Sequence, residues 1–191
     1  VALEGDLGAV RDLALRLPEI LPTGSVRMAL DRLTVVSPDL IAKLDEVQAR
    51  MAMVHYSFLA QAYIWGAETP GSFLPRALAV PIVALADRLG QQPLLQYSGY
   101  VLDNWGMLDL AKGVTLDNIY MIQKFAGGTD EAWFVLVHVA IEARAGAALA
   151  LYGPLIEAAA KGDADRAEGL LGQIVAIWAE INALFDRMPE Q

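Results

Sequence analysis

The amino-acid sequence predicts an all-α fold. Apolar side chains recur every three or four residues through most of the 191-residue chain, which is the spacing of one buried helix face. Stretches rich in glycine and proline separate these segments, as turns between helices do. One short segment, 118–125, is the only plausible strand. A sheet of four or more strands would therefore contradict the predicted class.

Individual helices are placed by their start and stop signals. Ser37 is a cap that precedes a proline at the first helical position, and Gly90 closes a later helix. The expected helices cover residues 7–17, 24–33, 38–65, 79–89, 94–105, 130–151 and 163–188. The glycine pair Gly127 and Gly128 is the sharpest candidate boundary. It predicts a small helical N-terminal domain, 1–127, and helices of a second domain, 128–191.

The chain is unusually apolar for a soluble protein. Hydrophobic residues make up 55% of it, and the mean hydropathy is +0.39. The longest uncharged run, 51–67, is shorter than the roughly 20 apolar residues that a membrane-spanning helix needs, so no membrane partner is expected. The excess apolar surface is instead expected to be covered by a cofactor, a partner or another part of the same protein.

Charge and cysteine content exclude several classes of function. The formal net charge is -9 and no basic cluster offsets it, which argues against a nucleic-acid partner. The absence of cysteine excludes disulfides, thiolate ligands and a cysteine nucleophile. No charged segment followed by an apolar one forms a signal peptide, and a cytoplasmic location is expected.

The two histidines are the candidate chemical residues. His138 lies in an apolar segment, where helical spacing places it beside Phe134, Val135 and Glu142. One interpretation is a core histidine bonded to a backbone carbonyl or to Glu142. The other is a histidine that approaches a cofactor which brings its own chemistry. His55 is interpreted as a core or partly exposed histidine.

No catalytic motif accompanies these histidines. A single histidine does not define a zinc site, and the sequence contains no serine elbow, phosphate loop or dinucleotide fingerprint. Taken alone, the pattern around Tyr97 and Tyr100 is more typical of packing residues than of functional ones.

Three segments, however, share their residue pattern with a known family. They are AYIWG at 62–66, LPRALAVPIVALADRLGQQPLLQYSGYVLDNW at 74–105, and WFVLVHVAIEARAG at 133–146. The middle segment is the most specific, since AVP, RLG, PLL, a tyrosine and VLDNW follow one another in a fixed spacing. In this order, the chain resembles the indoleamine 2,3-dioxygenase family.

The resemblance implies an all-helical haem enzyme. In such proteins a small N-terminal cap domain covers a larger helical domain that holds haem b and its iron, and 128–191 would be the first helices of the larger domain. They insert dioxygen across the indole 2,3 bond of tryptophan or a related indole, which gives an N-formylkynurenine-type product in the kynurenine pathway of tryptophan catabolism. Two alternatives stay open: a haem-binding relative that performs other oxidative chemistry on a tryptophan derivative in secondary metabolism, and a haem-free helical binding module.

The resemblance also implies which residues line the distal pocket above the haem. They are Tyr97, Tyr100 and Val101 from the middle segment and Phe134, Val135 and His138 from the last one. His138 stands where animal members often have serine, and in this it is similar to the distal histidine of tryptophan 2,3-dioxygenases. An imidazole at that position can hydrogen-bond bound dioxygen or the indole N–H, so His138 is the candidate catalytic residue.

The proximal side of the haem has no counterpart in the chain. In the family, the histidine that ligates the iron and the arginine that pairs with the substrate carboxylate lie in the second half of the sequence. No residue here matches that metal ligand, and His55 is not assigned to the role. We therefore expect the C-terminal half to be a second segment, left out by truncation, cleavage or splitting, and this chain alone to be inactive.

Overall fold

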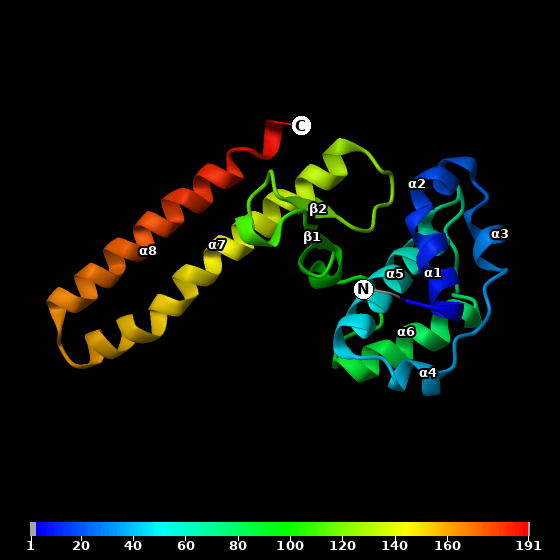
Figure 1. Cartoon of the computed structure of the whole chain (residues 1–191), viewed down its shortest axis with the longest axis horizontal. Coiled ribbons are helices and arrows are strands. Elements are labelled where there is room, and N and C mark those ends of the chain that lie inside the picture. The colour runs from blue at the N-terminus through cyan, green and yellow to red at the C-terminus, as the bar shows by residue number, and fades with distance from the viewer. Residues whose placement is uncertain (1–2, 191) are drawn as a thin grey trace. The chain divides into compact units, whose positions relative to one another are not determined.

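The computed structural model describes residues 3–190 and confirms the all-α class (Figure 1). The α-helices are α1 (Gly5–Leu15), α2 (Leu17–Ile20), α3 (Val26–Leu30), α4 (Pro38–Ala42), α5 (Glu46–Trp65), α6 (Arg76–Leu89), α7 (Thr129–Ala160) and α8 (Ala164–Phe185). Three-residue 3₁₀ turns occur at Leu21–Thr23, Leu110–Lys112 and Met188–Glu190. Two short strands, β1 (Trp105–Met107) and β2 (Ile119–Met121), pair into a two-stranded sheet. The strand expected in 118–125 is therefore present but shorter.

Helix α5 forms the centre of the first half of the chain. It packs against α1, α3 and α6, and most of its side chains are buried. Tyr56, Phe58 and Leu59 are each 0% exposed, which means that the helix is covered on more than one face. The helix begins with a capping box, in which the Asp45 carboxylate accepts from the Gln48 backbone N–H at 2.7 Å and the Gln48 side chain accepts from the Asp45 backbone N–H.

Several helix boundaries differ from the prediction. The helix expected over 130–151 extends to Ala160, and the one expected over 24–33 is shortened to Val26–Leu30. The single helix expected over 38–65 is wrong, because Ser37 caps only the short α4 and a new helix starts after Asp45. The capping box at Asp45 provides partners for backbone N–H groups that a continuous helix would bond internally. The helix expected over 94–105 is reduced to one π-helical turn, Ser98–Leu102, followed directly by β1. By contrast, Gly90 does close α6, in the left-handed conformation with φ of 65° that glycine adopts without strain.

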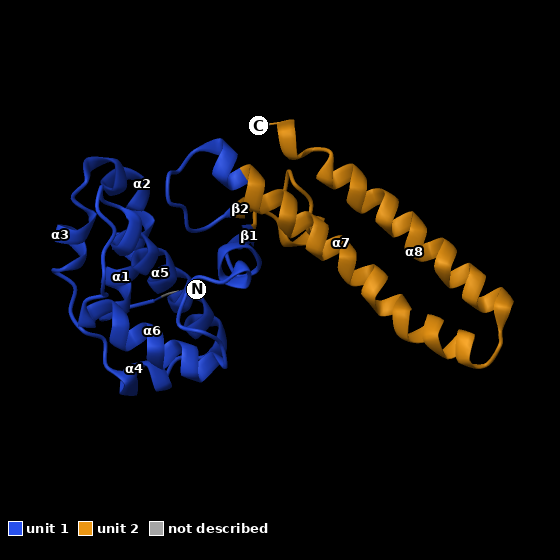
Figure 2. Ribbon diagram, turned by 180° about the vertical axis from the view of Figure 1, so that it is seen from behind, with its two compact units in different colours: residues 1–106, 121–132 blue, residues 107–120, 133–191 orange. Residues whose placement is uncertain are grey.

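The chain divides into two compact units (Figure 2). The first contains the residues up to Gly106 together with Met121–Ala132, and the second contains Met107–Tyr120 with the residues from Trp133 onward. The predicted domains, 1–127 and 128–191, follow this division approximately and stay a prediction.

The second unit is built on the α7–α8 hairpin. Asp163 caps α8 by accepting from the Arg166 backbone N–H, and the two helices pack through Ala148, Ile177 and Ile181. An ion pair between Arg144 and Glu180 joins them at the surface, with N–O distances of 2.5 and 2.8 Å. Outside this contact, many large side chains of the hairpin are exposed.

The exposed surface of the hairpin is strongly apolar. Exposed large side chains include Leu149, Ile156, Val175 and Phe185, each more than half exposed. Windows of 18 residues in Thr129–Ala160 and Ala164–Glu190 reach mean hydropathies of 1.7 and 1.2, so both helices are long and apolar enough to cross a membrane by length and composition alone. Core helices of soluble proteins pass the same test, although only 33% and 17% of these windows are buried within the chain. The length of the longest uncharged segment is therefore not enough to exclude a membrane-spanning helix in this chain.

Candidate active site

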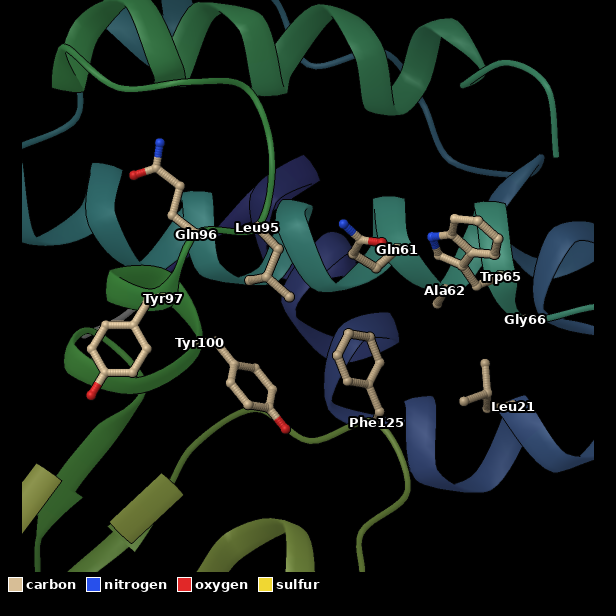
Figure 3. Close-up of a pocket in the computed structure, with 10 residues that line it drawn as sticks. All are labelled: Leu21, Gln61, Ala62, Trp65, Gly66, Leu95, Gln96, Tyr97, Tyr100 and Phe125. Carbon is tan, nitrogen blue, oxygen red and sulfur yellow. The ribbon is translucent and has the colours of Figure 1, made fainter. Parts of the chain in front are cut away.

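An aromatic pocket of about 570 Å³ lies in the first unit (Figure 3). Its walls come from the end of α5, the turn before Ser98–Leu102 and the segment that precedes α7. The lining residues are Leu21, Gln61, Ala62, Trp65, Gly66, Leu95, Gln96, Tyr97, Tyr100 and Phe125. A volume of this size, with mostly apolar walls and a few polar groups, is typical of a small-molecule site.

Three stacked aromatic rings, Phe58, Tyr100 and Phe125, form what we call the aromatic wall. Tyr100 and Phe125 line the pocket, and Phe58 packs against both rings without lining it. The Phe58 and Phe125 ring centroids are 4.3 Å apart with an interplanar angle of 28°. Tyr100 lies 5.6 Å from Phe58 and 6.3 Å from Phe125, again nearly parallel. Burial, and secondarily the carboxylate of Glu131, raise the pKa of Tyr100, so its hydroxyl stays protonated near neutral pH. The wall therefore presents flat, uncharged surfaces on which an aromatic ligand can stack.

Gly66 lets the backbone at the end of α5 approach its neighbours closely. A Cβ built at this position would lie 2.8 Å from Leu21 Cδ1 and 2.9 Å from Val26 Cγ1. Both distances are shorter than real carbon contacts, so no larger residue fits without displacing the wall. The last residue of the AYIWG motif is therefore explained by packing at the rim of the pocket.

Glu131 holds the segment that carries Phe125. Its carboxylate accepts hydrogen bonds from three successive backbone N–H groups, those of Phe125 and Ala126 at 2.8 Å each and that of Gly127 at 3.2 Å. Because Glu131 also lies in the first turn of α7, its charge is favourable to the helix dipole. The Phe125 backbone is therefore fixed directly to the start of α7.

His138 lies in the second unit, half-buried on α7. Its Nδ1 is 2.7 Å from the carbonyl oxygen of Phe134, and the two rings are 4.4 Å apart. A carbonyl oxygen only accepts, so Nδ1 carries the proton, and in the neutral imidazole Nε2 carries the lone pair. The interpretation as a histidine bonded to a backbone carbonyl thus describes its local geometry, and its catalytic role stays a prediction.

The other predicted site residues divide between the two units. In the first unit, Tyr97 and Tyr100 line the aromatic pocket, while Val101 is 0% exposed and does not line it. In the second unit, Val135 is 0% exposed and Phe134 is 46% exposed. The expectation that all six residues line one cavity stays a prediction, because each unit is described by itself.

Sequence reasoning missed several residues of the pocket. Gln61 and Trp65 were expected only as helical residues and Phe125 only as a strand residue. Trp65 and Gly66 belong to the AYIWG motif, which was a usable signal. Phe125 had none, since nothing local to it indicates stacking on a residue 67 positions earlier.

His55 is a core histidine. It is 1% exposed, and its Nδ1 is 2.9 Å from Gln123 Oε1. Burial, followed by the positive charge of Arg11, lowers the pKa of His55 and outweighs the opposite effect of the Gln123 hydrogen bond. The ring lies in the core of the first unit, where protein surrounds it. Within residues 3–190, no group of three or more His, Cys, Asp or Glu side chains converges as a metal site.

A second hollow of about 740 Å³ occurs in the second unit. Trp133, Arg144 and Arg187 contribute to its lining. Both arginines already have partners, since Arg144 pairs with Glu180 and Arg187 with Glu190. The two arginines are therefore already paired with carboxylates of the same unit, and the aromatic pocket is the better candidate for a binding site.

The helical fold and the aromatic pocket have the features of a protein that binds a small, largely apolar molecule. Comparison with known sequences narrows this class. The sequence profile described as indoleamine 2,3-dioxygenase matches residues 9–191, and the chain therefore belongs to the indoleamine 2,3-dioxygenase family.

Relatives with that name occur in fungi and mammals. The chain is 35% identical to indoleamine 2,3-dioxygenase of Saccharomyces cerevisiae over 185 residues, which is 92% of this chain and 41% of the yeast protein. An indoleamine 2,3-dioxygenase of Penicillium citrinum is 30% identical over 94% of this chain and 41% of its own length. Indoleamine 2,3-dioxygenase 1 of Mus musculus is 29% identical over 92% and 43%. The chain thus spans about 41% of the length of these fungal relatives.

Proposed function

We propose that this chain forms the N-terminal part of a haem-dependent dioxygenase that opens the indole 2,3 bond of tryptophan or a related indole. The product would be of the N-formylkynurenine type, which places the reaction in tryptophan catabolism, and the expected location is the cytoplasm. The observation that carries the proposal is the aromatic pocket lined by Tyr97 and Tyr100, in a chain of the indoleamine 2,3-dioxygenase family.

The pocket suits an indole ring. Phe125 and Tyr100 offer stacking surfaces, and the side chains of Gln61, Gln96 and Tyr97 supply the few polar groups at its lining. Such a combination orients an aromatic ligand without charging the site. Substrate selectivity toward indoles is therefore supported by the first unit alone.

His138 is the proposed catalytic residue. Because Nδ1 donates to the Phe134 carbonyl, Nε2 is the nitrogen that carries the lone pair in the neutral form of the imidazole. An acceptor matches the indole N–H, which is a donor, better than it matches bound dioxygen. We therefore favour the role of His138 as the hydrogen-bond acceptor for the substrate nitrogen.

The haem fits this chain only in part. When bound, haem b supplies the iron chemistry that activates dioxygen. The aromatic and apolar residues described here suit the surroundings of the distal face, but His55 is enclosed in the core, and no residue of the sequence matches the proximal histidine of the family. We propose that the ligand comes from a second segment, which corresponds to the C-terminal half of the relatives.

The same second segment accounts for the exposed faces of α7 and α8. Each large apolar side chain left in water forfeits roughly 1.5–3 kcal/mol. The open faces of the hairpin carry many such side chains, including Leu149, Ile156, Val175 and Phe185. We propose that protein, and not lipid, covers them. The chain alone is then expected to bind haem poorly and to be inactive.

The test compares two samples. Residues 1–191 alone, mixed with hemin, should show no sharp Soret band and no tryptophan turnover. The same chain co-expressed with a segment that corresponds to the C-terminal half should show both, with N-formylkynurenine identified by mass. In that complex His138→Ala should retain the Soret band and lose most of the turnover.

Other outcomes would change the proposal. A sharp Soret band and turnover from the chain alone would mean that His55 or His138 ligates the iron, which excludes a distal role. Haem binding with a different oxidised product would favour other oxidative chemistry on a tryptophan derivative. If the complex never binds haem, the remaining alternative is a haem-free helical binding module.

A further inference from the structure

We propose that Gln123 is a positioning residue that holds all three rings of the aromatic wall in place. It does not line the pocket. Its side chain bonds to His55 on α5, the helix that carries Phe58, and its backbone bonds to Asn104, which in turn bonds the turn that carries Tyr100. The proposal deepens the proposed function, since it names a residue on which the binding of an indole depends, and in that respect it rests on that function.

The Gln123 side chain is fully buried and fully bonded. Its Nε2 donates to the carbonyl oxygen of Ala14 at 2.7 Å and to that of Lys124 at 3.1 Å. Its Oε1 lies 2.9 Å from His55 Nδ1. Because the amide nitrogen donates, Oε1 is the acceptor, and His55 must therefore carry its proton on Nδ1. One side chain thus ties the 121–128 segment to α1 and to α5.

Asn104 extends the network to the turn that carries Tyr100. The Gln123 backbone N–H donates to Asn104 Oδ1 at 2.7 Å, and Asn104 Nδ2 donates to the Gln123 carbonyl at 2.9 Å. The same Nδ2 donates to the Tyr100 carbonyl at 3.1 Å. Asn104 is 0% exposed, so these bonds are shielded from competing water.

Each ring of the aromatic wall is therefore one step from Gln123. Phe125 follows it by two residues along the chain. Tyr100 is connected through Asn104, and Phe58 is connected through His55, which lies one helical turn before it on α5. Among residues 3–190, no other residue with a buried polar side chain bonds to both His55 and Asn104. Removing the side-chain amide should therefore loosen Phe58 relative to Tyr100 and Phe125, whereas the backbone bonds to Asn104 remain and the pocket keeps its lining residues.

The experiment uses the 191-residue chain and free indole as the probe. Nuclear Overhauser effects between the Phe58, Tyr100 and Phe125 rings measure whether the rings stay close together. A titration with indole measures the affinity of the pocket for this ligand. In Gln123→Leu, which keeps a similar volume, the contacts of Phe58 with Tyr100 and Phe125 should weaken or vanish, while the Tyr100–Phe125 contact persists through Asn104. The affinity for indole should fall at least tenfold. Gln92→Leu, the same change at an exposed site away from the pocket, should match the wild type in both measurements.

A second pair of variants covers the case in which Gln123→Leu does not fold. His55→Leu removes the donor to Oε1, whereas His55→Asn places an amide N–H near the position of Nδ1. We expect loosened rings and weaker indole binding in His55→Leu and near-wild-type values in His55→Asn. If the His55→Leu variant lost ring contacts only because the core was disrupted, His55→Asn would not restore the ring contacts and the indole affinity.

The results separate this proposal from the proposed function. Wild-type ring contacts and indole affinity in a folded Gln123→Leu or His55→Leu chain would overturn the positioning role. If the wild type binds no indole, the proposed substrate class fails for this unit, and the ring contacts still decide the role of Gln123.

Discussion

Replacing Glu131 tests how the pocket is joined to α7. Its carboxylate accepts from three backbone N–H groups, two of them at 2.8 Å. A hydrogen bond to a charged group contributes about 1.5–3 kcal/mol, and the lower end applies to a half-buried site. Two short bonds at that value give about 3 kcal/mol, which is the expected loss in the free energy of unfolding for Glu131→Ala. Glu131→Gln keeps one acceptor oxygen and should lose about half as much.

The assay combines urea unfolding with residue-level hydrogen exchange. In Glu131→Ala, the amides of Phe125, Ala126 and Gly127 should lose protection selectively, because their only acceptor is removed. Asp130→Asn is the matched control, since it removes a charge from the same helical turn without touching these amides. If Glu131→Ala and Asp130→Asn unfold at the same urea concentration with equal amide protection, the carboxylate does not hold the segment and the reasoning is wrong.

Two further predictions concern α5. The Tyr56 hydroxyl is buried without a hydrogen-bond partner among residues 3–190, which costs about 1–3 kcal/mol. Tyr56→Phe should therefore leave the free energy of unfolding unchanged or raise it. A clear decrease in a urea titration would show that the hydroxyl has a partner. The lowered pKa of His55 means that the unfolded chain binds the proton more tightly than the folded chain does. The free energy of unfolding should therefore decrease as the pH falls below about 6.5 and level off below the folded pKa, and His55→Asn should show a weaker dependence between pH 8 and 5.

The sequence determined the fold class, the family and the positions of most helices. Helical periodicity is a local property, so the lengths of α6 and α8 and the glycine at the end of α6 could be predicted within a few residues. The capping box at Asp45 was also present in the sequence, but an uninterrupted apolar pattern masked it. Tyr97 and Tyr100 were found as pocket residues through the family resemblance and not through periodicity.

Only the tertiary structure decided how the pocket is made. Phe58, Tyr100 and Phe125 meet although they lie on a helix, a π-helical turn and a loop, and no short-range pattern relates them. Gln123 fell within an expected strand, where its side chain had no assigned partner, yet it bonds Ala14, 109 positions away, and His55, 68 positions away. Such pairings depend on which segments are brought together when the apolar faces are buried. The spacing of residues along one helix carries no information about them, because a hydrogen bond between distant segments forms only after packing has placed both groups.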